Sequence, residues 1–346
     1  MSNFTSLTGL GWQTYFQQQL SLDEWDVTTP ARVVEQYKSE VTVATESDIF
    51  NIALLATMPE IVVGDWLLLD SQQHLLRVLD RKTCFSRKAA GSKLKRQLIS
   101  ANVDSAFIVT SMNDEFNLNR IERFLSLVNG SGADSVIVLS KSDQSEFPEN
   151  YIAQIQELDP FLMVEAINCL NTESVKKLTP WIKEGTTIAV LGSSGVGKST
   201  LIKTLLGEER QNTGGIREDD DKGRHTTTRR SLISLDAGGL ILDTPGMREI
   251  QMADCKEGIA TTFADIETYA KQCKFSDCQH QTEPGCAVQK AVDSGELDQR
   301  RLNNYLKLLR EEALNSASLS ERRSKDKALG KFYKHTLSQA HELKGR

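Results

Sequence analysis

Long apolar runs and a secretory leader are what the sequence most clearly lacks. No stretch reaches the roughly 18–20 apolar residues that a membrane-spanning helix needs. The closest, residues 53–69, is interrupted by Pro59, Glu60, Gly64 and Asp65. The start of the chain has no basic segment followed by an apolar core, so we expect no ordinary secretory signal. We therefore expect a cytoplasmic protein with no membrane partner.

An overall excess of positive charge is also missing. The formal net charge is −6, which argues against nucleic-acid binding by the surface as a whole. Basic residues are nevertheless clustered, because residues 81–96 hold seven Lys or Arg and no acid, and residues 322–346 are basic too. One such run is usually a solvated face, but two in an acidic chain favour an RNA contact. The candidates in the first run are Arg81, Lys82, Arg87, Lys88, Lys93, Lys95 and Arg96.

The cysteines do not suggest a disulfide framework. Three of the six crowd into residues 273–286 and the others are scattered, which in a cytosolic chain favours a metal site. The pattern C-x4-C-x-H-x5-C supplies three thiolates and one imidazole, enough for a closed tetrahedral zinc site of structural type. The alternative is free cysteines in a helical region, and Cys255 lies outside the spacing. The predicted zinc ligands are Cys273, Cys278, His280 and Cys286.

The length of 346 residues suits two or three domains rather than one core. Residues 1–31 have no clear period, but their aromatic residues predict a docked N-terminal extension. Residues 32–101 contain short alternating strands and turns, such as VVGDWLLLD and HLLRVLDR. This pattern predicts a small oligonucleotide-binding (OB-fold) β-barrel whose loops carry the basic run.

Residues 102–254 change to an alternation of buried strands and helices. Continuous apolar runs at 106–111, 135–140, 186–192 and 240–243 are typical of parallel strands covered on both faces. A helix that ends at Gly130 lies between the first two. The pattern predicts a doubly wound α/β domain. Residues 255–346 then form a helical domain with the metal site and a basic tail, in which Asp293 and Glu296 resemble a helix-capping pair.

A phosphate-binding loop is the strongest motif in the chain. GSSGVGKS fits G-x-x-x-x-G-K-[ST], follows an apolar strand and precedes a helix, which disfavours an ordinary glycine-rich turn. Glycines let backbone N–H groups surround a phosphate, Lys198 would hold the β- and γ-oxygens, and Ser199 would ligate Mg²⁺. The predicted binding residues are Gly192, Ser193, Ser194, Gly195, Val196, Gly197, Lys198, Ser199 and Thr200.

The segment LILDTPG supplies a second part of the same site. Asp243, at the end of an apolar run, would hold Mg²⁺ through water, and the Gly246 N–H would meet the γ-phosphate. Between the two motifs lies HTTT, where one of residues 226–228 would close on Mg²⁺; Thr227 is our candidate.

A guanine-reading loop precedes both motifs. In IVLSKSD, the stem of Lys141 would pack on the purine and the carboxylate of Asp143 would accept from guanine N1 and N2, which favours GTP over ATP. Ser140 stands where Asn or Thr is usual, which predicts a looser loop and weaker affinity; Ser142 completes the set. Small GTPases have the opposite order, so the sequence predicts a circularly permuted GTPase domain.

The position after D-x-x-G does not supply the usual water-orienting group. Met247 occupies the position where Ras-like enzymes carry a Gln, and Met cannot orient water. We therefore expect slow intrinsic hydrolysis that a partner raises. His225 is the candidate water-orienting group, with a loop histidine that contacts RNA or solvent as the alternative.

These motifs together resemble the RsgA (YjeQ) family of circularly permuted small-ribosomal-subunit GTPases over roughly residues 32–335. The resemblance includes VGDW, LDRKTCFSRK, NVD, SKSD, GSSGVGKST, GRHTTT, DTPGMRE and the Cys/His set. It implies an OB-fold barrel, a permuted GTPase domain and a zinc-containing helical domain. It also implies a role in late maturation of the small subunit, with contacts to its rRNA and faster GTP hydrolysis on the particle.

The sequence leaves one alternative function open, an RNA-binding assembly factor whose nucleotide site is structural and barely hydrolyses GTP. Intact Lys198, Ser199 and Asp243 favour the GTPase. The long aromatic N-terminal segment departs from the family pattern and suggests a changed docking contact. We expect a monomer, since docking on a large particle needs no symmetry.

Overall fold

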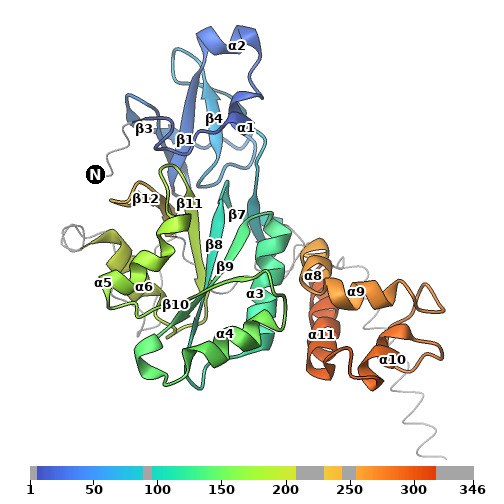
Figure 1. Cartoon of the computed structure of the whole chain (residues 1–346). Helices are drawn as coiled ribbons and strands as arrows, with labels where there is room; N and C mark the ends of the chain where they lie inside the picture. The colour runs from blue at the N-terminus through green and yellow to red at the C-terminus, as the bar shows by residue number, and fades with distance from the viewer. Residues whose placement is uncertain (1–5, 89–95, 208–229, 244–254, 317–346) are drawn as a thin grey trace, which may run out of the picture.

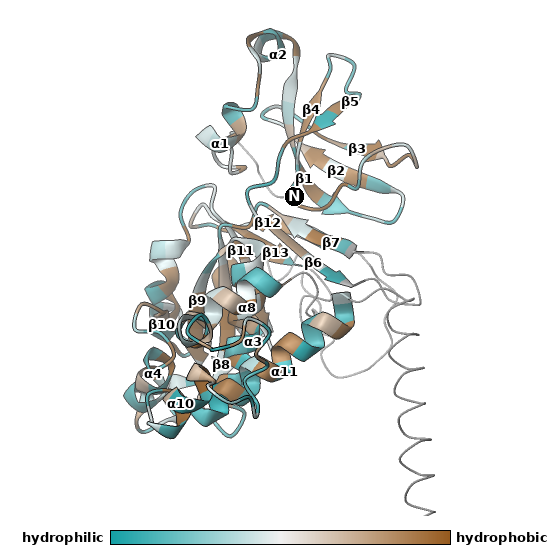
Figure 2. Ribbon diagram, turned by 90° about the vertical axis from the view of Figure 1, so that its right-hand side faces the viewer, coloured by the Kyte–Doolittle hydropathy of each residue, from teal (hydrophilic) through white to brown (hydrophobic). Residues whose placement is uncertain are grey.

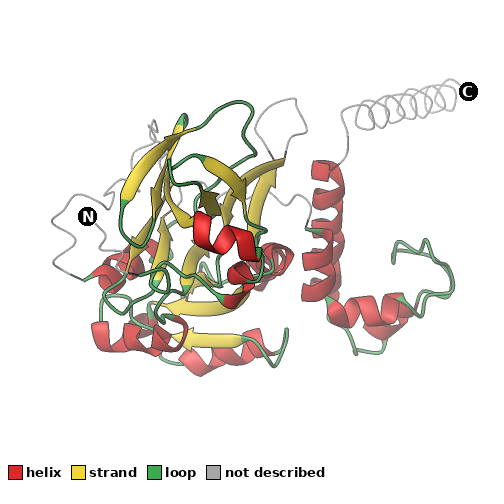
Figure 3. Ribbon diagram, turned by 90° about the horizontal axis from the view of Figure 1, so that it is seen from above, coloured by secondary structure: helices red, strands yellow, loops and turns green. Residues whose placement is uncertain are grey.

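The computed structural model describes residues 6–88, 96–207, 230–243 and 255–316. An N-terminal antiparallel module stands above a sheet flanked by helices, and the C-terminal helices lie beside that sheet (Figure 1). The view from above shows the same lateral position of the C-terminal helices (Figure 3). None of the helices within these ranges is long and apolar enough to cross a membrane.

Five antiparallel strands build the N-terminal module in the order β3-β2-β1-β4-β5. They are β1 (Thr29–Gln36), β2 (Glu40–Ala44), β3 (Ile49–Ala53), β4 (Trp66–Leu69) and β5 (Leu75–Val78). Alternate side chains point inward, as the strand period requires, and form one apolar cluster of Ala31, Val33, Val41, Val43, Ile61, Leu67 and Leu69. This arrangement is the partly open five-stranded barrel expected of an OB-fold.

The segment before β1 packs against this module and contains two short helices, α1 (Thr14–Gln17) and α2 (Leu22–Val27). Leu10 and Phe16 are fully buried. Trp12 and Phe16 pack on Trp66 of β4 with ring centroids 4.8 and 5.8 Å away. These buried aromatic contacts hold the N-terminal segment on the barrel.

A hairpin of β6 (Cys84–Lys88) and β7 (Arg96–Ala101) connects the barrel to the central sheet. The central sheet has the order β10-β9-β8-β11-β13-β12, with only β12 antiparallel to its neighbour within this set. Its strands are β8 (Ser105–Ser111), β9 (Asp134–Ser140), β10 (Met163–Ala166), β11 (Thr187–Gly192), β12 (Arg230–Ser234) and β13 (Leu240–Asp243).

The predicted parallel strands are confirmed, and every residue of β8 and β11 is buried. Figure 2 shows these strands mostly brown, whereas the surrounding helices alternate brown and teal. The covering helices are α3 (Leu118–Ser131), α4 (Pro148–Gln156), α5 (Thr172–Val175) and α6 (Lys198–Leu206), with 3-10 turns η1 (Ser142–Gln144) and η2 (Lys176–Trp181). The helix α3 ends one residue later than predicted, because Gly132, with φ 82°, provides the left-handed cap.

One strand pairing joins the barrel to the central sheet. β1 runs antiparallel to β12, with Glu35 opposite Ser231 and Gln36 opposite Arg230, so a single 11-stranded sheet spans both modules. The buried Arg32 of β1 reinforces the junction. Its guanidinium donates to the carbonyl oxygens of Leu10 and Asn102 and to Thr187 Oγ1 at the start of β11.

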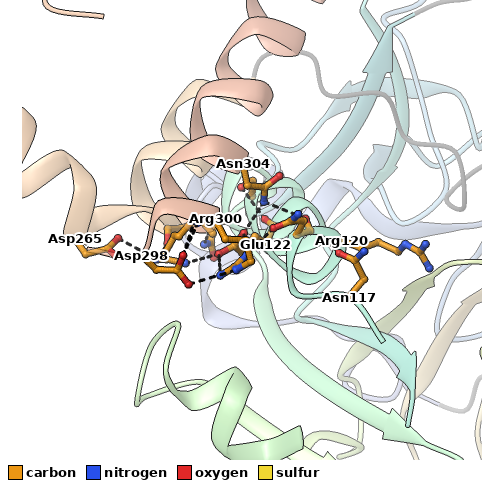
Figure 4. A network of polar contacts seen from close by, with 12 residues as sticks. Asn117, Arg120, Glu122, Asp265, Asp298, Arg300 and Asn304 are labelled. Carbon is orange, nitrogen blue, oxygen red and sulfur yellow. Dashed lines mark hydrogen bonds and ion pairs between the residues drawn. The ribbon is translucent and has the colours of Figure 1, made fainter. Parts of the chain in front are cut away.

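The C-terminal module consists of α8 (Lys256–Thr262), α9 (Ala264–Ala270), α10 (Ala287–Asp293) and α11 (Gln299–Ser316). α8 crosses α3 closely, because a Cβ on Gly258 would lie 2.1 Å from the Ser126 carbonyl oxygen. A polar network centred on the fully buried Glu122 of α3 adds a second contact (Figure 4). Glu122 accepts hydrogen bonds from Arg300, Arg301 and Asn304 of α11.

Candidate nucleotide site and metal centre

The phosphate-binding loop joins β11 to α6. Gly192 has φ 144°, and a Cβ there would lie 2.3 Å from the carbonyl oxygen of Val109, so a side chain would force β11 away from β8. Gly197 caps α6 with φ 96°, in the left-handed region. The buried ammonium of Lys198 donates to the Ser193 carbonyl and therefore lies within the loop. A lysine at a helix N-terminus makes this loop a suitable anion site.

The guanine-reading loop begins where β9 ends. Ser140 is fully buried, and its Oγ lies 2.6 Å from the Val196 carbonyl oxygen and 3.2 Å from that of Thr110. A hydroxyl has one proton, so the shorter contact to the phosphate loop takes it. Lys141 then adopts a left-handed conformation, with φ 58°, and turns the chain into the short η1 that carries Asp143. Ser140 therefore links the two loops rather than loosening them, while its effect on affinity stays a prediction.

A third segment, residues 167–169 after β10, was not predicted as part of the site. The Ser142 N–H donates to the Ile167 carbonyl at 3.1 Å, and Thr204 Oγ1 donates to that of Cys169 at 2.6 Å. A Cβ on Gly197 would lie 3.7 Å from Cys169 Sγ. Burial raises the pKa of Cys169 to about 11, and the nearby Asp143 charge adds to the effect, so the thiol is neutral at pH 7. The position of this segment after a strand of the same sheet is a sequence signal that could have found it.

Asp243 reaches the same edge of the sheet. β13 is parallel to β11, with Leu242 opposite Ala189, and Asp243 is its last residue. Ser199 lies in the first turn of α6. A hydroxyl and a carboxylate are oxygen ligands of the kind that Mg²⁺ prefers, so these two residues fit the predicted cation. Four other predicted positions, Gly246, Met247, His225 and Thr227, lie outside the described residues.

The sheet thus brings together motifs that are far apart in the chain. Ser140, Gly192 and Asp243 end β9, β11 and β13, which run parallel in the order β9-β8-β11-β13. Carboxyl ends of parallel strands share one edge, where ligands bind in open α/β sheets. The phosphate loop, the guanine-reading loop and the acidic residue therefore form one site, although the guanine-reading loop comes first in the sequence.

The predicted zinc ligands also come together, and their geometry fits the ion. The ligand atoms of Cys273, Cys278, His280 and Cys286 lie within 4.8 Å of one another. A tetrahedral zinc with ordinary bond lengths needs about 3.8 Å between sulfurs and about 3.6 Å between sulfur and nitrogen. Cys273 Sγ and Cys286 Sγ are 3.9 Å apart, and each is 3.6 Å from His280 Nδ1. Burial lowers the pKa of His280, which favours the neutral imidazole that binds metal.

Hydrogen bonds around the cluster hold its loop in shape. Gln289 on α10 donates from its side chain to the His280 carbonyl at 2.6 Å, and its backbone N–H donates to Cys286 Sγ at 3.4 Å. Glu283 accepts from the backbone N–H groups of Gln279, Gln281 and Thr282, which lowers the pKa of Glu283 to about 2. Such supporting bonds orient metal ligands.

The basic run before the central sheet has a more structural role than the sequence indicated. Arg81 makes a two-pronged pair with the buried Asp65, at 2.7 and 2.8 Å. Burial raises the pKa of Asp65, and the Arg81 pair opposes that rise. Lys82 contacts Asp104 at 3.4 Å, and Arg87 donates to Gln97 at 3.2 Å. The other four candidates have positions or side chains outside the described part of the chain: Lys88, Lys93, Lys95 and Arg96.

The fold and site together define a circularly permuted P-loop GTPase. The chain matches the family model of the RsgA GTPase over residues 78–253. It is 54% identical to the small ribosomal subunit biogenesis GTPase RsgA 2 of Vibrio vulnificus, over 98% of this chain and 97% of that protein. It is 43% identical to RsgA of Xanthomonas axonopodis pv. citri, over 85% of this chain and 83% of that one. The chain belongs to the RsgA family and is a GTP hydrolase.

Solved structures agree with this assignment. The crystal structure of YjeQ from Thermotoga maritima has a TM-score of 0.61 and 26% identity, covering 82% of this chain and 98% of that one. YloQ, described as a circularly permuted GTPase, has a TM-score of 0.59 over 84% of this chain and 96% of that one. At 22% identity, YloQ supports the fold alone. The fold class expected from the sequence is confirmed.

Proposed function

We propose that this GTPase binds the small ribosomal subunit and assists its late maturation, with slow intrinsic hydrolysis that the subunit stimulates. The observation that carries the proposal is the meeting of three loops, after Ser140, Gly192 and Asp243, at one edge of the sheet. The subunit as partner is supported by the names of the Vibrio and Xanthomonas relatives.

The chemistry assigns each loop a task. Asp143 accepts from guanine N1 and N2, while Lys141 packs on the purine face. Lys198 and the N-terminus of α6 bind the phosphates. Ser199 and Asp243, with Thr227, would hold Mg²⁺, which neutralises charge on the transferred phosphoryl group. Gly246 would add an N–H donor to the γ-phosphate.

A side chain other than that of Met247 must orient the attacking water. Met247 offers no hydrogen-bond donor or acceptor strong enough for a water. We assign this task to His225, which lies in the same GRHTTT segment as the predicted cation-contacting Thr227. Productive placement of His225 on the particle would explain stimulation by the subunit.

The flanking modules provide docking. We propose that the barrel domain, residues 32–101, contacts rRNA through its basic run, with Arg81 positioning the strand rather than binding phosphate. We propose that residues 255–346 form a domain stabilised by one structural zinc. We propose domain boundaries at 31/32, 101/102 and 254/255, with β1 starting three residues before the first of them. The protein would act as a cytoplasmic monomer.

Cosedimentation with purified ribosomal subunits tests the proposal. The full chain is mixed with small or large subunits in the presence of GDP or a non-hydrolysable GTP analogue. We expect binding to small subunits that is tighter with the analogue, and no comparable binding to large subunits. Equal binding to both subunits, or none to either, would contradict the proposed partner.

A further inference from the structure

The helix α2 is fixed to the barrel although none of its residues is buried. Ser21 and Glu24 form a reciprocal capping box, with bonds of 3.3 and 2.8 Å. The Glu24 carboxylate also receives two bonds from Arg77 of β5, at 2.8 and 3.1 Å. Arg77 donates further to the Gln19 carbonyl at 2.7 Å. A six-residue helix is not stable alone, so these polar contacts hold it in place.

The side chains that α2 presents to solvent are unusually apolar for such a short helix. Leu22, Trp25 and Val27 are 87%, 47% and 64% exposed. Leu22 and Trp25 are three residues apart and therefore share one helix face. Val27 lies about 140° around the helix from Leu22. Single exposed apolar residues are ordinary, but Leu22 and Trp25 together on one fixed helix face form a small patch. Trp is also the residue type most enriched at binding hot spots.

The charge around this patch selects its partner. Asp23 and Asp26 are exposed on the same helix, and no Lys or Arg occurs between residues 21 and 28. Acidic side chains repel RNA phosphates. Arg87, in the described part of the basic run, lies instead on β6, whereas α2 lies at the far end of the barrel from the central sheet (Figures 1 and 2). The patch therefore fits a positively charged protein surface with an apolar depression.

We propose that Leu22 and Trp25 dock on a basic protein of the small ribosomal subunit, with Asp23 and Asp26 pairing with its cations. This inference rests on the proposed function. It divides the contacts of the barrel between the basic run, which faces RNA, and α2, which faces protein.

Two variants of the full chain test the patch in subunit-binding titrations with a non-hydrolysable GTP analogue. Trp25→Ser and the double change Asp23→Lys/Asp26→Lys should each weaken binding about tenfold. The control is Glu46→Lys/Asp48→Lys, which makes the same charge change at exposed positions of the β2–β3 turn and should not weaken binding. All variants should keep the intrinsic GTP turnover of the unaltered protein.

A benzophenone photocrosslinker in place of Trp25 identifies the partner on the same particles. Crosslinking to a basic ribosomal protein supports the proposal, and crosslinking to rRNA overturns it. Unchanged affinity of both α2 variants also overturns it while leaving the proposed function intact. If the unaltered protein binds no subunits, the proposed function and this inference fail together.

Discussion

Ser140 Oγ donates a 2.6 Å hydrogen bond to the carbonyl oxygen of Val196. This bond links the strand that ends in the guanine-reading loop to the middle of the phosphate loop, 56 positions further along the chain. Both residues are buried, so water does not compete for the contact. We therefore expect this one hydroxyl to couple base recognition to phosphate binding.

Replacing this hydroxyl should weaken nucleotide binding. Ser140→Ala leaves the buried Val196 carbonyl without its donor, at a cost of about 1–2 kcal/mol, so we expect GTP and GDP to bind roughly 5- to 30-fold more weakly. Ser111→Ala is the matched control, because Ser111 is the buried neighbour of Ser140 on β8 and bonds to Asn113 instead. Fluorescent-nucleotide titration measures both. Equal affinities of the two variants would contradict the coupling.

Asp143 should determine the choice of base. Asp143→Asn removes the charged acceptor for guanine N1 and N2, and two charge-assisted hydrogen bonds justify a loss of roughly 100-fold or more in GTP affinity. Xanthine keeps the N1 donor but presents a carbonyl oxygen where guanine presents its 2-amino donor, which an Asn amide N–H can meet, so XTP should bind the variant better than GTP. The exposed Glu146→Gln makes the same charge change nearby and should retain GTP preference. A variant that still prefers GTP would exclude Asp143 from base recognition.

The zinc site should be structural and separable from catalysis. We expect one zinc per chain by atomic spectroscopy, lost in Cys286→Ser and His280→Ala but retained in Cys255→Ser, whose thiol lies outside the cluster. Removal of the metal should expose the loop at 273–286 to protease. Intrinsic GTP turnover should persist, because the nucleotide site lies on the central sheet. Stoichiometric zinc in Cys286→Ser would refute the ligand set.

The network at Glu122 should hold the C-terminal module on α3 (Figure 4). Glu122→Gln leaves Arg300 and Arg301 facing an uncharged side chain, and disrupting a buried pair costs about 3 kcal/mol. Glu311→Gln alters the pair with Arg123 on the same two helices, whose side chains are 28% and 29% exposed, and should cost less than Glu122→Gln. Hydrogen exchange in α11 compares them. Similar protection in both variants would argue against a dominant role for Glu122.

The nucleotide site could be predicted because each motif adjoins a continuous apolar strand. Parallel strands place their carboxyl ends together, so Ser140, Gly192 and Asp243 had to meet once the sheet was recognised. The Cys/His cluster could be predicted because its four residues lie close together in sequence. Local spacing of chemically distinctive residues is enough for both.

The pairing of strands that are far apart in the sequence could not be predicted from local residue spacing. Gln36 and Arg230 help to join the barrel to the central sheet, although they are 194 positions apart. They are opposite each other on β1 and β12, and Arg230 donates to the Gln36 side chain. The hydrophobic periodicity of the sequence does not predict such a pairing. The prediction of a helix cap failed for a different reason. A short polar pattern of the capping type occurs at many places in a chain, including places where no helix begins. The predicted pair of Asp293 and Glu296 is wrong, since Asp293 is the last residue of α10. Asp298 instead directly precedes α11 and accepts from the Arg300 N–H at 2.5 Å.

The central claim is tested most directly by GTP turnover of the purified chain, alone and with small ribosomal subunits, beside Lys198→Ala. The account predicts slow turnover alone, a rise of orders of magnitude with small subunits, and no comparable rise in the variant. Turnover that stays negligible on subunits that bind the protein would contradict it and favour an RNA-binding assembly factor with a structural nucleotide site.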